Sequence, residues 1–137
     1  DGSSKLGTTT PRDYASMFVR MAQGKLISPT SDEQMIEILK KQHYNSMITK
    51  DFPPVYMDID NTDEVLIHVA SKSGSMDACR NDGGIIYTPY GKYVLVMLNK
   101  NFSDAMYYPN HPATVFGAKV SRMLLDQFLA LEGRFHL

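Results

Sequence analysis

The segment VLIHVASKSGS, at residues 65–75, joins a run of apolar, β-prone residues to the polar triplet Lys72-Ser73-Gly74 and a further serine, Ser75. The apolar run at residues 65–70 predicts a β-strand, and the triplet directly follows it. Taken alone, the triplet is a short pattern, and Lys72 would ordinarily be a solvated lysine at the end of a strand. Its interpretation therefore depends on the sequence around it.

Two further apolar runs lie downstream of the triplet. The dipeptide Gly83-Gly84 precedes the run at residues 85–88, and the run at residues 93–98 follows turn-forming residues. Two such runs around a four-residue turn are typical of an antiparallel hairpin. We therefore expect three strands between residues 64 and 98, followed by a polar loop.

The residues before the strands predict an amphipathic helix. Thr10 is a good N-cap, and Pro11 suits the first position of a helix. Gly24 is suited to end it. Apolar residues recur between them at the i, i+3, i+4 and i+7 positions: Tyr14, Met17, Phe18 and Met21.

Two more helices complete the predicted order of elements. One begins at Ser28 or at Ser31, so that residues 8–42 hold two helices, and a long helix with a wide apolar face occupies residues 113–131. Residues 43–54 show no clear period. The order helix, helix, three strands, helix predicts an α+β fold in which an antiparallel sheet is flanked by helices.

Composition excludes several classes of protein. The 137 residues suffice for one domain, and the net charge of -1 does not suggest the basic face that nucleic-acid binding needs. No apolar run reaches the roughly 18 residues of a membrane span. Cys79 is the only cysteine, and neither it nor the histidines show zinc-ligand spacing. We expect no metal and no cofactor.

Three features, in chain order, resemble the class A serine β-lactamases. In penicillin-recognising enzymes a Lys-Ser/Thr-Gly triplet ends a strand, as residues 72–74 do here. Residues 9–15 (TTPRDYA) resemble the start of the class A helix that follows the omega loop, and residues 80–87 (RNDGGIIY) resemble the next strand of the hairpin. The resemblance implies the C-terminal half of a β-lactamase/transpeptidase-like fold, with residues 1–7 as the end of the omega loop.

The motif that carries the nucleophile in this family is absent from the sequence. No serine has a lysine three residues later, and no Ser-x-Asn motif is present. Tyr108-Pro109-Asn110 matches the Tyr-x-Asn variant by its letters, but it follows the Lys-Ser-Gly triplet rather than preceding it. We therefore interpret it as a turn.

The resemblance also implies roles for residues of the triplet and its surroundings. Lys72 and Ser73 would hold the substrate carboxylate, the backbone N–H of Ser75 would be one oxyanion donor, and Gly74 would leave room for substrate along the strand edge. Arg80 could add a guanidinium for that carboxylate. The alternative for Arg80 is a surface arginine paired with Asp77 or Asp82, in the loop before the strand.

Three functions remain open from the sequence. The first is part of a serine β-lactamase acting on β-lactams, the second a penicillin-binding D-Ala-D-Ala peptidase or esterase acting on peptidoglycan peptides, and the third a non-catalytic, truncated binding domain. The family implies a periplasmic or secreted location. The partner would be a complementary N-terminal half or a second copy, because the sheet would keep an open edge and the helix at residues 10–24 would expose its apolar stripe.

Overall fold

The computed structural model describes residues 7–42, 47–57, 65–76 and 78–131. Residues 1–6, which hold most of the predicted end of the omega loop, lie outside these ranges. One antiparallel sheet occupies the middle of the molecule, with strands β1 (His68–Met76), β2 (Cys79–Thr88) and β3 (Gly91–Lys100) in the order β1-β2-β3. Within the described residues, β1 and β3 are therefore the two edges of this sheet.

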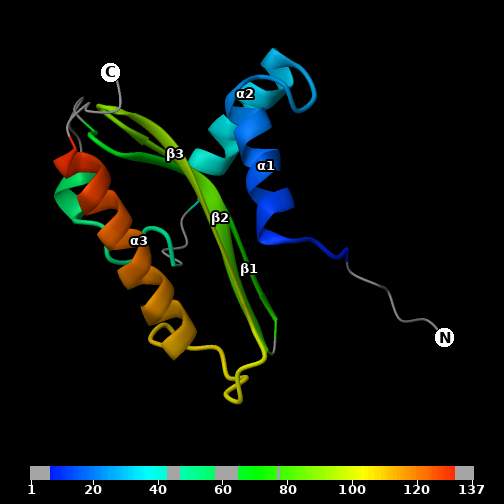
Figure 1. Ribbon diagram of the computed structural model, residues 1–137, viewed down its shortest axis with the longest axis vertical. Coiled ribbons are helices and arrows are strands. Elements are labelled where there is room, and N and C mark those ends of the chain that lie inside the picture. The colour runs from blue at the N-terminus through cyan, green and yellow to red at the C-terminus, as the bar shows by residue number, and fades with distance from the viewer. Residues whose placement is uncertain (1–6, 43–46, 58–64, 77, 132–137) are drawn as a thin grey trace.

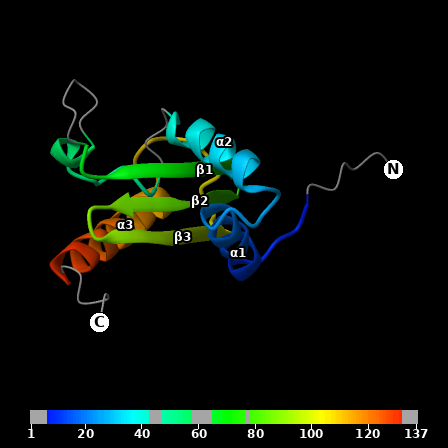
Figure 2. The same ribbon diagram turned by 90° about the horizontal axis from the view of Figure 1, so that it is seen from above.

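Helices cover both faces of the sheet (Figures 1 and 2). Helices α1 (Pro11–Ala22) and α2 (Pro29–Lys40) lie on one face, with α1 against β2 and β3 and α2 against β1. Helix α3 (Pro112–Ala130) lies on the other face together with the 3-10 turn η1 (Pro54–Tyr56). The arrangement confirms the predicted α+β fold of a sheet flanked by helices.

The first two helices begin where their caps are. The Thr10 side chain accepts a hydrogen bond from the Asp13 N–H at 3.1 Å, and Ser28 accepts one from the Ser31 N–H at 3.2 Å. In each helix the next residue is a proline, whose missing N–H costs nothing at the first helical position. These local bonds satisfy backbone donors that no helical carbonyl can reach.

The strands differ in extent from the sequence-based prediction. β1 contains the Lys-Ser-Gly triplet instead of ending before it, and β2 begins at Cys79 instead of after the glycine pair. The pairing of β1 with β2 continues to Met76 opposite Cys79, so the whole triplet is paired with β2. The residues of the triplet lie on an edge strand and do not alternate between apolar and polar. The hydrophobic pattern therefore did not predict that they belong to the strand.

The apolar stripe of α1 packs against the sheet. The Phe18 side chain is 1% exposed and forms a cluster with Ala70 and Ile85, and Met21 is also buried. The prediction that this stripe would be exposed is therefore wrong for Phe18 and Met21. Tyr14 and Met17 are half-buried.

A second cluster lies between the sheet and α3. It joins Ile67 and Ile86 of the sheet region to Leu125 of α3 and to Ile48. The buried Ser121 hydroxyl donates a hydrogen bond of 2.8 Å to the Ile48 carbonyl oxygen, so segment 47–57 is tied to α3 by a polar contact as well as by apolar packing.

The adjacent glycines of β2 permit two close approaches. A Cβ at Gly83 would lie 2.8 Å from the Tyr14 ring of α1, and a Cβ at Gly84 would lie 2.6 Å from the Ala70 carbonyl oxygen in β1. A Cβ at Gly74 would meet nothing within 4 Å. The Gly84 contact is with backbone, which cannot rotate away.

We predict that Gly84→Ala destabilises the chain by about 1–3 kcal/mol, because the added methyl group overpacks the β1–β2 pair. Gly74→Ala is the matched control. It has the same effect on the unfolded chain, and it should change the free energy of unfolding by no more than about 1 kcal/mol. Urea denaturation of both variants at one protein concentration measures the difference. Equal changes in the two variants would show that the close approach at Gly84 does not limit stability.

Candidate functional site

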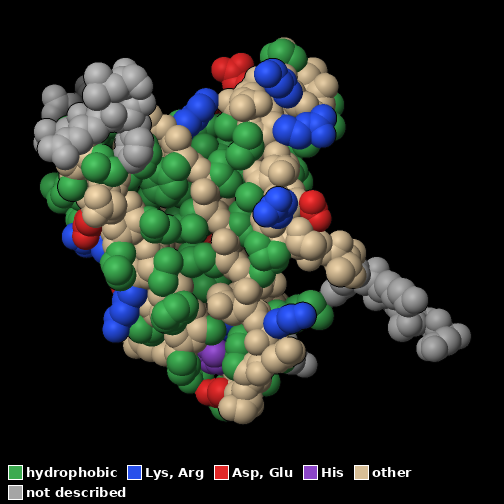
Figure 3. Space-filling model, viewed as in Figure 1, with side chains coloured by type: hydrophobic (Ala, Val, Ile, Leu, Met, Phe, Trp, Pro, Cys, Tyr) green, Lys and Arg blue, Asp and Glu red, His purple; other side chains and the backbone are tan. Residues whose placement is uncertain are grey.

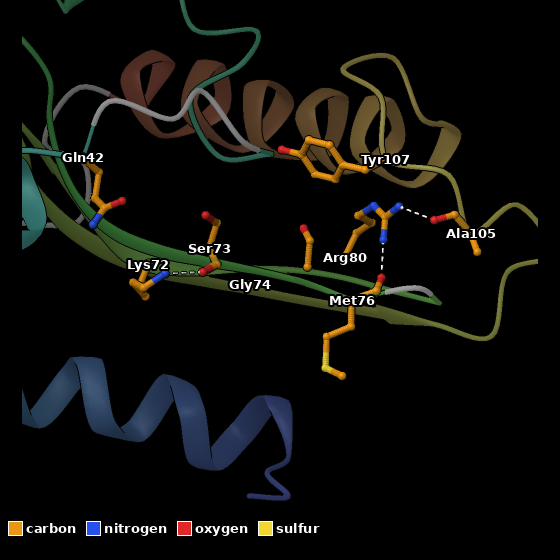
Figure 4. A pocket seen from close by; sticks show the side chains of 9 residues that line it. Gln42, Lys72, Ser73, Gly74, Met76, Arg80, Ala105 and Tyr107 are labelled. Atoms are coloured by element: carbon orange, nitrogen blue, oxygen red, sulfur yellow. Dashed lines mark hydrogen bonds between the residues drawn. The ribbon is translucent and has the colours of Figure 1, made fainter. Parts of the chain in front are cut away.

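A groove of about 520 Å³ lies along the edge of β1 (Figure 4). One wall is the C-terminal part of β1, and the other is formed from residues of the loop between β3 and α3, with Arg80 of β2 between them. The lining residues are Gln42, Lys72, Ser73, Gly74, Ser75, Met76, Arg80, Ala105 and Tyr107. The structure thus brings all five residues singled out in the sequence to one groove.

Strand geometry divides the triplet between two faces of the sheet. Ser73 points to the α3 side, and alternation places Ser75 on the same side. Neither hydroxyl is hydrogen-bonded to another residue in the described ranges, so both can serve a ligand. The Lys72 side chain starts from the opposite face, and its Nζ donates a 2.6 Å hydrogen bond to the Ser73 carbonyl oxygen. The ammonium group therefore lies at the strand edge beside the groove.

The stem of Lys72 also borders a second, apolar hollow of about 320 Å³ between α1 and α2. The other residues that line this hollow are Tyr14, Met17, Phe18, Met21, Leu26, Met35, Ile38 and Leu39. Because this hollow is apolar, the Lys72 ammonium group is more stable when it turns toward the polar groove.

Tyr14 links α1 to the triplet. Its hydroxyl donates a 3.3 Å hydrogen bond to the Lys72 carbonyl oxygen. Burial raises the pKa of the Tyr14 phenol above its usual value, and the nearby Asp82 carboxylate raises it further. The phenol therefore stays protonated, and remains a donor, well above neutral pH.

Arg80 is buried, not on the surface as one sequence interpretation had it. Its side chain and backbone together are 3% exposed. Nη1 donates to the carbonyl oxygens of Met76 and Cys79, and Nη2 donates to those of Ala105 and Met106 at 3.2 and 3.0 Å. These carbonyl oxygens are hydrogen-bond partners of its guanidinium nitrogens, whereas Asp77 lies outside the described residues. Arg80 therefore acts as a clamp between the β1–β2 connection and the loop after β3.

Asp82, on the same strand as Arg80, accepts hydrogen bonds from backbone N–H groups. Its carboxylate is fully buried and accepts hydrogen bonds from the Ile48 N–H at 2.9 Å and from the Gly83 N–H at 3.0 Å. It lies opposite Ser73 in the strand register. Asp82 thus ties segment 47–57 to β2.

The loop at residues 101–111 has an internal framework centred on Asp104. Its carboxylate accepts hydrogen bonds from the Tyr108 hydroxyl at 2.7 Å and from the Met106 N–H at 3.0 Å. These bonds lower the pKa of Asp104, the Tyr108 bond contributing most. His111 Nδ1 accepts from the Ala113 N–H at the start of α3, so we assign the proton to Nε2, which donates to the Asp104 carbonyl oxygen at 2.8 Å.

Sequence analysis missed Gln42, Ala105 and Tyr107 as groove residues. Gln42 follows α2, and the other two lie in a segment that the sequence marked only as a polar loop. The one signal was the run Met106-Tyr107-Tyr108, an unusually apolar stretch for such a loop.

Other kinds of site find no support in the described ranges. They contain no group of three His, Cys, Asp or Glu side chains that could hold a metal ion. Cys79 is a half-buried free thiol and is the first residue of β2. His68, the first residue of β1, is exposed. Among the helices in the described ranges, none is long and apolar enough to cross a membrane.

Comparison with known proteins identifies the family. Residues 1–128 match the model of the β-lactamase enzyme family. No curated protein matches the chain.

Solved structures of this family share the fold. A β-lactamase from Sphaerobacter thermophilus DSM 20745 is 27% identical with a TM-score of 0.68, over 87% of this chain and 40% of that one. A mutant of PBP-A, solved as an acyl-enzyme complex with penicillin G, is 26% identical with a TM-score of 0.68, over 90% and 41%. A β-lactamase from Chitinophaga pinensis DSM 2588, at 20% identity and a TM-score of 0.59 over 87% and 42%, shares the fold alone.

The chain spans about two fifths of the length of these structures. The family match covers nearly all of the chain, and the groove carries the Lys-Ser-Gly triplet that first indicated this family. The chain belongs to the β-lactamase enzyme family.

Proposed function

We propose that the chain forms one wall of the substrate groove of a serine β-lactamase-like hydrolase. The observation that carries the proposal is the arrangement at the edge of β1, where the Lys72 ammonium group and the Ser73 and Ser75 side chains border one groove. The groove volume falls in the range that holds small organic ligands. The family match and the likeness to a penicillin G acyl-enzyme support a β-lactam as the ligand.

Each residue has a role that suits its chemistry. The Lys72 ammonium group attracts the ligand carboxylate, and the Ser73 hydroxyl donates a hydrogen bond to it. The Ser75 backbone N–H serves as one of two oxyanion donors. Gly74 leaves space along the strand edge, since nothing lies within 4 Å of where its Cβ would be.

The covalent step needs a nucleophile from outside these residues. In the proposed reaction a serine oxygen attacks the lactam carbonyl, the C–N bond breaks, the nitrogen takes up a proton, and water then hydrolyses the acyl-enzyme. No serine of the chain stands in a Ser-x-x-Lys motif. A complementary N-terminal half of the family fold would supply it, and the family suggests a periplasmic or secreted location.

Two alternatives have an observation in their favour. The likeness to PBP-A supports a penicillin-binding peptidase or esterase, which would lack the base that hydrolyses the acyl-enzyme. The missing Ser-x-x-Lys motif supports a non-catalytic domain that binds a ligand or a partner. A glutamate base in the complementary N-terminal half would favour the β-lactamase over the first alternative.

We predict that Lys72→Ala weakens the binding of penicillin G to the chain by roughly tenfold, because a charged hydrogen bond to the carboxylate is lost. Lys119→Ala removes the same charge from an exposed site on α3 and is the matched control. Ligand-observed NMR titration measures both. The same loss in the two variants would mean that net charge, and not the groove, attracts the ligand.

The chain by itself should not hydrolyse nitrocefin at enzymatic rates. Removing the nucleophile of another serine hydrolase lowers turnover by about a million-fold, because only binding and oxyanion stabilisation remain. Absorbance of the ring-opened product, followed with the purified chain, tests this. Turnover typical of an enzyme would point to a nucleophile among the serines of this chain.

We also propose a partner on the open edge of β3. The six apolar residues 93–98 are all only half-buried, and hydrophobic side chains gather over β3 between α3 and α1 (Figure 3). A run of six apolar residues is typical of a strand whose two faces are both covered, and an unpaired sheet edge is a template for pairing with another chain. Either a complementary half or a second copy would cover this edge.

Sedimentation velocity tests this proposal on the purified chain. We expect a species heavier than one chain, or a weakly cooperative melt where no partner is present, because an open apolar edge favours association. A monomer at all concentrations with a cooperative melt would contradict the need for a partner and leave the groove proposal standing.

A further inference from the structure

Tyr107 forms an exposed aromatic wall of the groove. Its side chain is 70% exposed, and in Figure 4 it lies on the same side of the sheet as Ser73, across the groove from β1. Exposed tyrosines that line a cavity are common binding residues, because the ring offers a large contact area with few rotatable bonds. The roles proposed for the Lys-Ser-Gly triplet and for the Ser75 N–H leave Tyr107 without a function.

The backbone on both sides of Tyr107 is held in place. Arg80 Nη2 donates to the Met106 carbonyl oxygen at 3.0 Å, and the Met106 N–H is bound to the Asp104 carboxylate at 3.0 Å. Tyr108, the next residue, binds the same carboxylate through its hydroxyl. A ring on such a fixed segment needs little further ordering when a ligand binds.

Arg80 also contacts the ring itself. Its guanidinium carbon lies 5.4 Å from the centre of the Tyr107 ring and 5.2 Å from the centre of the Phe102 ring. The Nε atom of Arg80 is buried without a hydrogen-bond partner in the described ranges, although the other two nitrogens bind four carbonyl oxygens. The buried guanidinium group therefore holds the loop through hydrogen bonds and contacts the Tyr107 ring at the same time.

We propose that Tyr107 is a specificity-determining residue that packs against an aromatic side chain of the ligand, and that Arg80 is its positioning residue. The inference rests on the proposed function and names its ligand class: a β-lactam with an aryl-containing acyl side chain. The carboxylate lies at Lys72 and Ser73, and the aryl group lies on the Tyr107 ring. Ring-to-ring packing of this kind changes affinity by roughly three- to tenfold.

The test compares two ligands that differ only in the aryl side chain. Penicillin G carries a phenylacetyl group, and 6-aminopenicillanic acid has the same bicyclic carboxylate without it. Affinities of the full chain for both are measured by ligand-observed NMR titration. The readout is the ratio of the two affinities, which a general loss of structure would not change.

Tyr107→Ala should lower the preference for penicillin G over 6-aminopenicillanic acid by roughly three- to tenfold, and Tyr107→Phe should keep it. Tyr90→Ala, at the opposite end of the sheet in the β2–β3 turn, is the control and should also keep it. Arg80→Lys should reduce the preference as Tyr107→Ala does, because lysine cannot bind the four carbonyl oxygens and stack on the ring together.

Each other result has a definite meaning. Equal affinities of the unsubstituted chain for the two ligands, or a preference that survives Tyr107→Ala, would overturn the role of Tyr107 and leave the groove proposal intact. Binding of neither ligand would overturn the proposed function, and the inference with it.

Discussion

The close approach of α1 to β2 at Gly83 is the constraint on which the rest of the structure depends. A side chain at this position would meet the Tyr14 and Phe18 rings, so only glycine lets the helix lie directly on the sheet. That distance allows Phe18 to fill the core and allows the Tyr14 hydroxyl to reach the Lys72 carbonyl oxygen. The edge of β1 is therefore fixed by a helix that begins some sixty residues earlier in the chain.

Buried polar groups hold the opposite face in a similar way. Asp82 binds the Ile48 N–H, and Ser121 binds the Ile48 carbonyl oxygen, so one residue of segment 47–57 is joined to both β2 and α3. Arg80 joins the β1–β2 connection to the loop after β3. Each bond links elements distant in sequence, and a buried group that lost its partner would cost roughly 1–3 kcal/mol. These bonds specify the arrangement around the groove more narrowly than apolar packing can.

Local signals predicted the helices and the fold class, and long-range contacts decided the rest. Thr10 and Ser28 cap their helices with bonds three residues ahead, which is a pattern that a sequence displays directly. The extent of β1 depends on its partner strand, so the polar triplet could not be recognised as strand from its own residues. Arg80 binds carbonyl oxygens 25 and 26 residues away, and nothing near it in the sequence marks those partners.

The sheet register places the loop that carries Tyr107 at the same end of the sheet as the groove. Ser75 of β1, Arg80 of β2 and Asn99 of β3 lie opposite one another in a single row across the three strands. The Asn99 side chain donates to the Arg80 carbonyl oxygen at 3.1 Å, two residues before the loop that carries Tyr107 begins. The Lys-Ser-Gly strand and the loop that carries Tyr107 thus meet at one end of the sheet, and Arg80 joins them through hydrogen bonds to the Met76 and Met106 carbonyl oxygens.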